Sequence, residues 1–251
     1  MITGVASGRG LGFDALRLCL PQQVVLLTGL STVVPEGATL AVMGRSGVGK
    51  STLLRAIAGL VQPSSGRVER PAERVPVVFQ EPRLLPWRSA LQNVELVLPV
   101  EQRDRAREWL ARVGLADSAD AYPLTLSGGM RQRVSIARAL ACESPILLVD
   151  EPFAHLDVLT AARLRTEFTG HLAGRTRTTV WVTHDPGEAA AVAERTLVMA
   201  GPPHGEWQIV QHDPSHTVEQ TAANLAAALQ QTGTANPDRT FHGSPISAAT
   251  G

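Results

Sequence analysis

The sequence is poor in cysteine, in aromatic residues and in long hydrophobic runs. Its 251 residues include only two cysteines, Cys19 and Cys142, too few for a framework of disulfides, and this favours a reduced, cytosolic setting. No stretch of about 18 consecutive apolar residues occurs, so no transmembrane helix is predicted. The glycine-rich start lacks the apolar core of a secretory signal. A protein of this kind that works at a membrane must dock onto another chain.

Net charge is absent as well, because 23 Lys and Arg residues balance 23 Asp and Glu residues. No basic field is available to attract a polyanion, so we expect no nucleic-acid partner. Apolar residues make up 44% of the chain, which is ordinary for a soluble globular protein. The length permits one large domain or two modest ones, and either could bury a core.

Strand-like and helical patterns alternate along most of the chain. Strands are expected at 39–43, 75–79, 146–149, 178–182 and 196–199, and helices at 50–60, 103–113 and 160–172. Further strand patterns precede Pro35, and residues from about 82 to 143 are mainly helical in character. This order predicts a mainly parallel sheet that carries an antiparallel edge and an inserted helical block.

A glycine-rich segment connects the strand expected at 39–43 to the helix expected at 50–60, and it matches the P-loop pattern. Its glycines allow successive N–H groups to turn around phosphate oxygens, and the helix N-terminus adds a positive dipole end. Lys50 is expected to reach the β- and γ-phosphates of ATP, and the Ser51 hydroxyl to bind Mg²⁺. The expected nucleotide-binding residues are Gly44, Arg45, Ser46, Gly47, Val48, Gly49, Lys50, Ser51 and Thr52.

Two adjacent carboxylates, Asp150 and Glu151, end the apolar strand expected at 146–149. Side chains alternate along a strand, so the two carboxylates point in different directions. Asp150 is expected to hold the Mg²⁺ of the nucleotide, which leaves Glu151 to polarise the attacking water as the catalytic base. The alternative is a solvated Asp-Glu turn, which the phosphate loop upstream disfavours.

A second helix start suited to phosphate lies at Ser127, Gly128 and Gly129. Free N–H groups at such a start stabilise an anion. A single ATP at the phosphate loop would leave this second start unused. Two copies packed head-to-tail would let each one cap the ATP of the other, so a homodimer is predicted.

The segment 126–133 resembles the signature of ABC ATPases, and Tyr122-Pro123 ahead of it strengthens the match. Gln80, 30 residues after Lys50, resembles the Q-loop glutamine of that family. His184 resembles its switch histidine and Asp157 its D-loop aspartate. The resemblance covers roughly residues 14–205 and rests on the order of these motifs along the chain.

Membership of this family implies roles for several of these residues. Ser127 would contact the γ-phosphate held by the other subunit, whereas His184 would contact the γ-phosphate of its own. Gln80 would take part in catalysis and in binding the metal, together with Ser51 and Asp150.

Within the family, the segment 79–87 looks most like that of importers of nitrate, sulfonates and taurine, and Met130 is also similar to that branch. The segment after the Q-loop glutamine receives a helix of the permease in such transporters. Leu84, Leu85 and Trp87 are suitable apolar anchors for that contact. The alternative is that they pack inside their own helical block.

Two positions depart from the family pattern. His155 stands where a smaller residue is usual in the D-loop. The family stacks an aromatic ring on adenine just after its first strand, but that position is Pro21 here. No Phe, Tyr or Trp occurs between Phe13 and Phe79.

The sequence thus predicts an α/β fold: a P-loop NTPase (RecA-like) core with an antiparallel β subdomain and an inserted α-helical subdomain. An ABC ATPase domain is expected over 1–205, with its helical subdomain at about 82–143. A partly disordered C-terminal tail is expected over 206–251, with one amphipathic helix near 218–229.

The predicted function is ATP binding and hydrolysis that drives an ABC importer of a small anion such as a sulfonate, nitrate or taurine. The expected partners are transmembrane permease subunits, a second ATP-binding subunit and, indirectly, a solute-binding protein, at the cytoplasmic face of the membrane. One alternative is a soluble ABC ATPase that acts mechanically without a permease. A second alternative, a pseudo-ATPase that only binds nucleotide, is disfavoured by intact Lys50, Asp150, Glu151 and His184.

Overall fold

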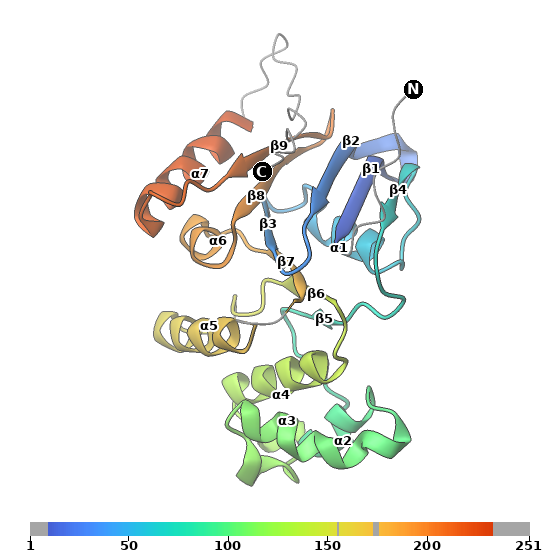
Figure 1. The fold of residues 1–251 in the computed structure, drawn as a ribbon, viewed down its shortest axis with the longest axis vertical. Coiled ribbons are helices and arrows are strands. Elements are labelled where there is room, and N and C mark those ends of the chain that lie inside the picture. Colours follow the sequence, from blue (N-terminus) through green and yellow to red (C-terminus); the bar gives the residue numbers. More distant parts are fainter. Residues whose placement is uncertain (1–9, 155, 173–175, 233–251) are drawn as a thin grey trace, which may run out of the picture. The chain divides into compact units, whose positions relative to one another are not determined.

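The computed structural model describes residues 10–154, 156–172 and 176–232 (Figure 1). The chain forms two compact units. The first unit combines the residues up to 71 with those from 178 onward, and the second unit is made of residues 72–177.

A three-stranded antiparallel sheet forms one part of the first unit. Its strands are β1 (Leu11–Leu20), β2 (Val24–Val34) and β4 (Ser65–Glu69), in the order β2-β1-β4 (Figure 1). Leu16 and Leu18 are buried while Arg17 between them is exposed, as the alternation of the sequence predicts. A short 3₁₀ turn, Pro21–Gln23, joins β1 to β2.

A second sheet of the first unit carries the phosphate loop. Its strands within this unit are β3 (Thr39–Gly44), β7 (Thr178–Val182), β8 (Arg195–Gly201) and β9 (Glu206–Gln211). Strand β3 is parallel to both β7 and β8, and β9 closes the edge antiparallel to β8. The helices of this unit are α1 (Lys50–Ile57), α6 (Pro186–Val192) and α7 (Val218–Thr232). Residues 40–43 are buried, as expected of a strand covered on both faces.

Residues 206–232 belong to the first unit and include one strand and one helix. Strand β9 pairs with β8, and the expected boundary at residue 205 falls in the turn between these two strands. The amphipathic helix expected near 218–229 is confirmed as α7, and its Leu225 packs with Met43 of β3 and Ala189 of α6. Residues 233–251, where disorder was expected, lie outside the described residues.

The second unit contains a short parallel strand pair and the helical block. Strands β5 (Val77–Val78) and β6 (Ile146–Asp150) pair in parallel. The helices are α2 (Ala90–Glu95), α3 (Ala106–Arg112), α4 (Gly128–Ala141) and α5 (Val158–Leu172), with 3₁₀ turns at Val100–Arg105, Ala116–Ser118 and Pro123–Thr125. Strand β5 is shorter than the expected 75–79 because Pro76 has no N–H to donate, although its carbonyl still accepts from Leu148.

Local sequence signals explain how the helices of the second unit begin. Ser89 and Gln92 form a reciprocal capping box at the start of α2. Trp109 of α3 is buried and anchors the core of the block. Within the described part of the chain, no helix combines the length and apolar character needed to cross a membrane.

Candidate functional site

The phosphate loop of the first unit runs from the end of β3 to the start of α1 and has a backbone that requires glycine. Gly44, Gly47 and Gly49 have φ angles of 157°, 81° and 109°. A Cβ at Gly44 would lie 2.6 Å from the carbonyl oxygen of Met199, and one at Gly49 would lie 2.9 Å from the Cβ of Leu26. A side chain at either position would therefore displace a neighbouring strand.

Lys50 is the first residue of α1 and is only 8% exposed. Its ammonium group donates to the carbonyl of Gly44 at 2.9 Å and to that of Arg45 at 3.1 Å. The side chain thus folds back over the start of the loop. Ser51, the next residue, is exposed, and Thr52 is half-buried.

His184 lies at the same edge of the sheet as the phosphate loop. Val42 of β3 pairs with Val182 of β7, and Gly44 and His184 each lie two residues beyond that pair. The Thr183 N–H extends the pairing to the carbonyl of Val42 at 3.2 Å. Because the carboxyl ends of parallel strands form one edge, the fold brings these two sequence-predicted elements together.

The residues that flank His184 are anchored. The Thr183 hydroxyl accepts from the N–H of Asp185 at 3.1 Å, and the Asp185 carboxylate accepts from the N–H of Gly187 at 2.8 Å. Asp185 is therefore the N-cap of α6. His184 itself is exposed, so its imidazole projects from a rigid turn at the strand end.

The second unit repeats this arrangement with Gln80 and Glu151. Val78 of β5 pairs with Val149 of β6, and Gln80 and Glu151 each lie two residues further along. Asp150, the last residue of β6, and Glu151 are both half-buried. Glu151 has a φ of 43°, in the left-handed region that a residue with a side chain rarely adopts. Such strain is characteristic of functional positions.

The expected helix start at Ser127 is confirmed, and the structure adds a role that the sequence analysis did not state. The hydroxyl of Ser127 accepts from the N–H of Met130 at 3.2 Å, so Ser127 is the N-cap of α4. The side chain remains exposed. A Cβ at Gly129 would come within 3.7 Å of the Thr160 side chain, an ordinary contact with α5.

Asp157 is the N-cap of α5, a second capping role that the sequence analysis missed. Its carboxylate accepts from the N–H of Thr160 at 3.0 Å, and this hydrogen bonding lowers the pKa of Asp157. The spacing of an Asp three residues before Thr160 was the available signal. His155, the D-loop position that departs from the family pattern, lies outside the described residues.

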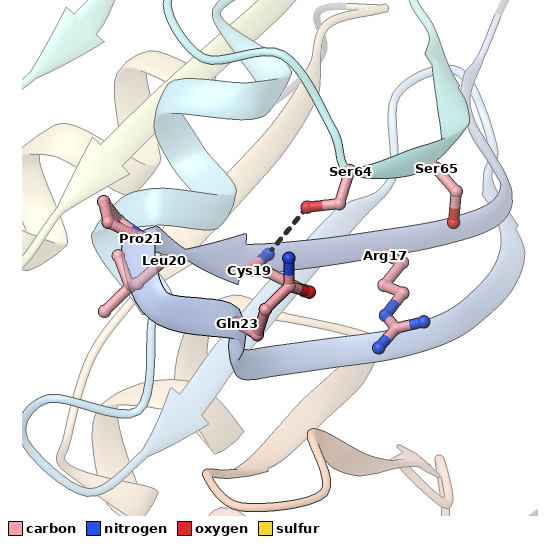
Figure 2. Close-up of a pocket in the computed structure, with 7 residues that line it drawn as sticks. All are labelled: Arg17, Cys19, Leu20, Pro21, Gln23, Ser64 and Ser65. Atoms are coloured by element: carbon pink, nitrogen blue, oxygen red, sulfur yellow. Dashed lines mark hydrogen bonds between the residues drawn. The ribbon is translucent and has the colours of Figure 1, made fainter.

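Pro21, at the expected adenine position, lies beside an open cavity of about 380 Å³ at the β1–β2 turn (Figure 2). Pro21 is exposed, and the Ser64 hydroxyl accepts from the Cys19 N–H at 3.1 Å across the cavity floor. The lining contains no aromatic ring. The lining residues are Arg17, Cys19, Leu20, Pro21, Gln23, Ser64 and Ser65. The sequence analysis found only Pro21, because the cavity forms only when Ser64 and Ser65, more than 40 positions away, meet the end of β1.

The family model described as "ABC transporter" matches residues 27–154. The aliphatic sulfonates import ATP-binding protein SsuB 2 of Frankia alni is 46% identical over 232 residues, which cover 90% of this chain and 93% of the relative. A second such protein, SsuB of Granulibacter bethesdensis, is 51% identical over 69% of this chain and 73% of its own length.

Solved structures agree with these relatives. An inward-facing metal-chelate type ABC transporter matches with a TM-score of 0.71 and 26% identity, over 80% of this chain and 83% of its own. A dimeric ATP-binding cassette in a post-hydrolysis state, bound to ADP and Pi, matches with a TM-score of 0.65 and 31% identity, over 75% of this chain and 93% of its own. The expected P-loop NTPase fold is thereby confirmed, and the chain belongs to the ABC transporter family, as a subunit that binds and hydrolyses ATP.

Proposed function

We propose that this chain powers the import of a small sulfonated anion. The relatives from Frankia alni and Granulibacter bethesdensis are both named as aliphatic sulfonate import ATP-binding proteins. The likeness extends over most of the chain in both cases, which supports transfer of the transported class as well as of the ATPase activity. The solute itself would be selected by partner chains, because no transmembrane segment occurs among the described residues.

The main support for a nucleotide-binding site is the position of Lys50, which folds over a glycine loop at the start of α1. Glycines with positive φ allow the loop N–H groups to turn toward a phosphate, α1 begins at the end of the loop, and the Lys50 ammonium is held there by carbonyl oxygens. This combination suits a chain of phosphates. Residues 44–52 are therefore proposed to bind the triphosphate of ATP, with Lys50 at the β- and γ-phosphates.

Oxygen donors suited to Mg²⁺ are available in both units. Ser51 offers an exposed hydroxyl beside the loop, while Asp150 and Gln80 offer a carboxylate and an amide oxygen at one strand edge. Hard oxygen ligands of this kind are those that Mg²⁺ takes in nucleotide sites. When bound, the ion supplies charge neutralisation at the phosphates.

Hydrolysis is assigned to Glu151 and His184. Glu151 follows the strand end at a half-buried position whose backbone is in the left-handed region. As the base, it takes a proton from the water that attacks the γ-phosphorus. His184 is exposed at the end of β7, beside the phosphate loop, and is proposed to contact the γ-phosphate.

A second copy of the chain is proposed to complete each site. The start of α4 is exposed at Ser127 and Gly128, and Ser127 keeps a hydroxyl that can still donate. Helix starts of this type bind anions, so the exposed start of one copy can cap the ATP of the other. The dimeric relative bound to ADP and Pi supports this assembly.

The segment after Gln80 is proposed to dock the permease subunits at the cytoplasmic face of the membrane. Trp87 is 70% exposed, whereas Leu84 and Leu85 are half-buried. The N–H and the carbonyl of Leu85 are both bonded to the fully buried Asn93 side chain, which makes the loop rigid. Trp87 therefore fits the partner anchor, while the leucines also pack within their own block.

Reconstitution tests this proposal. The chain is combined with candidate permease and solute-binding proteins from its own organism, in proteoliposomes that contain ATP and Mg²⁺. We expect ATP-dependent uptake of a labelled alkanesulfonate or taurine, and loss of uptake when Trp87 is replaced by Ala. An ATPase that neither co-purifies with a permease nor responds to any of these anions would support the soluble, mechanical alternative.

A further inference from the structure

Helix α4 holds the loop around Gln80 through three hydrogen bonds. The side-chain amide of Gln132 donates to the carbonyl of Phe79 at 3.2 Å, directly before Gln80. The Arg138 guanidinium donates to the carbonyl of Pro82 at 2.9 Å and to that of Arg83 at 3.0 Å. Hydrogen bonds from one helix thus hold the backbone on both sides of Gln80.

The tied loop has a strained backbone of its own. Arg83 has a φ of 46°, in the region that disfavours residues with side chains. Its guanidinium lies 4.1 Å from the centre of the Phe79 ring, so the two ends of the loop also contact each other. A strained segment persists only where its surroundings over-determine it, and α4 supplies those constraints.

Both donors on α4 are withdrawn from water, which makes their bonds costly to lose. Gln132 is 2% exposed. Arg138 is partly buried, and this burial lowers the pKa of its guanidinium. A hydrogen bond from a charged donor to a carbonyl is stronger than a neutral one, so removal of Arg138 takes away two strong bonds to the loop.

The same helix begins at Ser127, so one rigid element of 14 residues connects the exposed anion-binding start to the Gln80 loop. We propose that Arg138 and Gln132 are positioning residues, which keep Gln80 at a fixed place relative to Ser127 and so set the rate of ATP turnover. This inference rests on the catalytic role proposed for Gln80. Arg138 lies outside the signature segment 126–133, and Gln132 lies within it but was given no role of its own by the sequence analysis.

Arg133 offers a matched control on the same helix. It donates to the carbonyl of Val113 at 3.2 Å and pairs with Glu167 at 2.8 Å, and neither contact involves the Gln80 loop. Loss of Arg133 should therefore cost stability in the same way as loss of Arg138, without a specific effect through Gln80.

The test is a set of double-mutant cycles on the full chain, read as kcat and KM for ATP with Mg²⁺ present. Arg138→Met, Gln132→Met and Arg133→Met are each measured with Gln80 intact and with Gln80→Ala. We expect Arg138→Met to lower kcat by about 10- to 100-fold, with KM nearly unchanged, because misplacement at a site costs rate more than binding. Arg138→Lys, which keeps a charged donor, should recover part of kcat.

The energetic coupling of each variant to Gln80→Ala distinguishes a specific effect on the position of Gln80 from a general loss of stability. If Arg138 acts through Gln80, the Arg138→Met loss disappears once Gln80 is Ala, and the Gln132→Met loss shrinks likewise, whereas the Arg133→Met effect stays independent. Should Arg138→Met fail to fold, Gln132→Met and Arg138→Lys carry the same cycles. If the losses of kcat in Arg138→Met and Gln132→Met simply add to that of Gln80→Ala, the positioning role is wrong, while the catalytic role proposed for Gln80 still stands. Unchanged kcat in Gln80→Ala would instead remove the role of Gln80 itself, and the inference with it.

Discussion

The ammonium group of Lys50 donates a hydrogen bond to the carbonyl of Gly44, six residues earlier, at a distance of 2.9 Å. The two residues are the ends of the phosphate loop, so the lysine holds the loop closed. Lys50 is the cation best placed to meet the phosphates that the loop is proposed to cradle.

Replacement of Lys50 with Ala should weaken ATP binding itself. The variant loses both the charge that would pair with the β- and γ-phosphates and the two bonds that close the loop. Isothermal titration with ATP and Mg²⁺ measures the change. Arg55→Ala is the control, because Arg55 is an exposed cation in the last turn of α1 and lies outside the residues proposed to bind ATP. Equal losses in the two variants would contradict the special role of Lys50.

Replacement of Glu151 with Gln should slow hydrolysis far more than it weakens binding. Gln keeps the volume of the side chain but cannot accept the proton of the attacking water, so turnover should fall by about 10²- to 10⁴-fold. Phosphate release under saturating ATP gives the rate, and titration gives the affinity. The ATP-bound dimer should accumulate in this variant. Turnover at the original rate would show that Glu151 is not the base.

Replacement of Ser127 with Arg should prevent ATP-dependent dimerisation. A bulky cation at the start of α4 would occupy the place where the γ-phosphate of the other copy should dock, while the phosphate loop of the same copy stays intact. Size-exclusion chromatography in the Glu151→Gln background shows the outcome. Ser127→Ala is the control, because it removes the helix cap, at a cost of about 1 kcal/mol of stability, without placing a bulky cation in the way of the γ-phosphate. Normal dimerisation of the Arg variant would contradict the head-to-tail arrangement.

Replacement of Pro21 with Tyr should tighten ATP binding. The cavity beside Pro21 has no aromatic lining, and stacking of a base on a ring contributes about 1–3 kcal/mol, or roughly 5- to 100-fold in affinity. Titration with ATP measures the gain in affinity. Titration of the native chain with GTP tests a second expectation, that without an aromatic ring the chain discriminates poorly between ATP and GTP. Pro21→Ala, which adds no ring, should bring no gain. Unchanged affinity in Pro21→Tyr would mean that the adenine lies elsewhere.

Mild acid should destabilise the fold through His212. Its Nε2 shares a 2.8 Å hydrogen bond with the Thr196 hydroxyl, and burial lowers the pKa of the imidazole below its ordinary value of about 6.5. A lowered pKa means that the stability contributed by the neutral ring is present above about pH 6.5 and is lost as the pH falls through the folded-state value. Urea unfolding at pH 7.5 and 5.5 should show the loss. His212→Gln should reduce it, whereas the exposed His204→Gln should not.

Local patterns were sufficient for the phosphate loop and for the acidic strand end. The glycines at 44, 47 and 49 have backbone angles that other residues resist, and an apolar run that ends in Asp150 and Glu151 can be read without knowledge of its neighbours. The helix start at Ser127 was equally local, because capping depends on residues within one turn. The division at residue 205 was harder to place, since the pairing of β9 with β8 depends on the register of the whole sheet and not on a local motif.

The sequence by itself determined the type of protein, because the residues that surround phosphate and end the buried strands form short motifs in a fixed order. Only the tertiary structure decided which distant groups support them. Arg138 reaches the carbonyls of Pro82 and Arg83 across more than 50 positions, and His184 comes to the edge of the phosphate loop because Val182 pairs with Val42. Backbone carbonyls look the same in every residue, and strand register depends on the whole sheet, so contacts of this kind become visible only when the chain is folded.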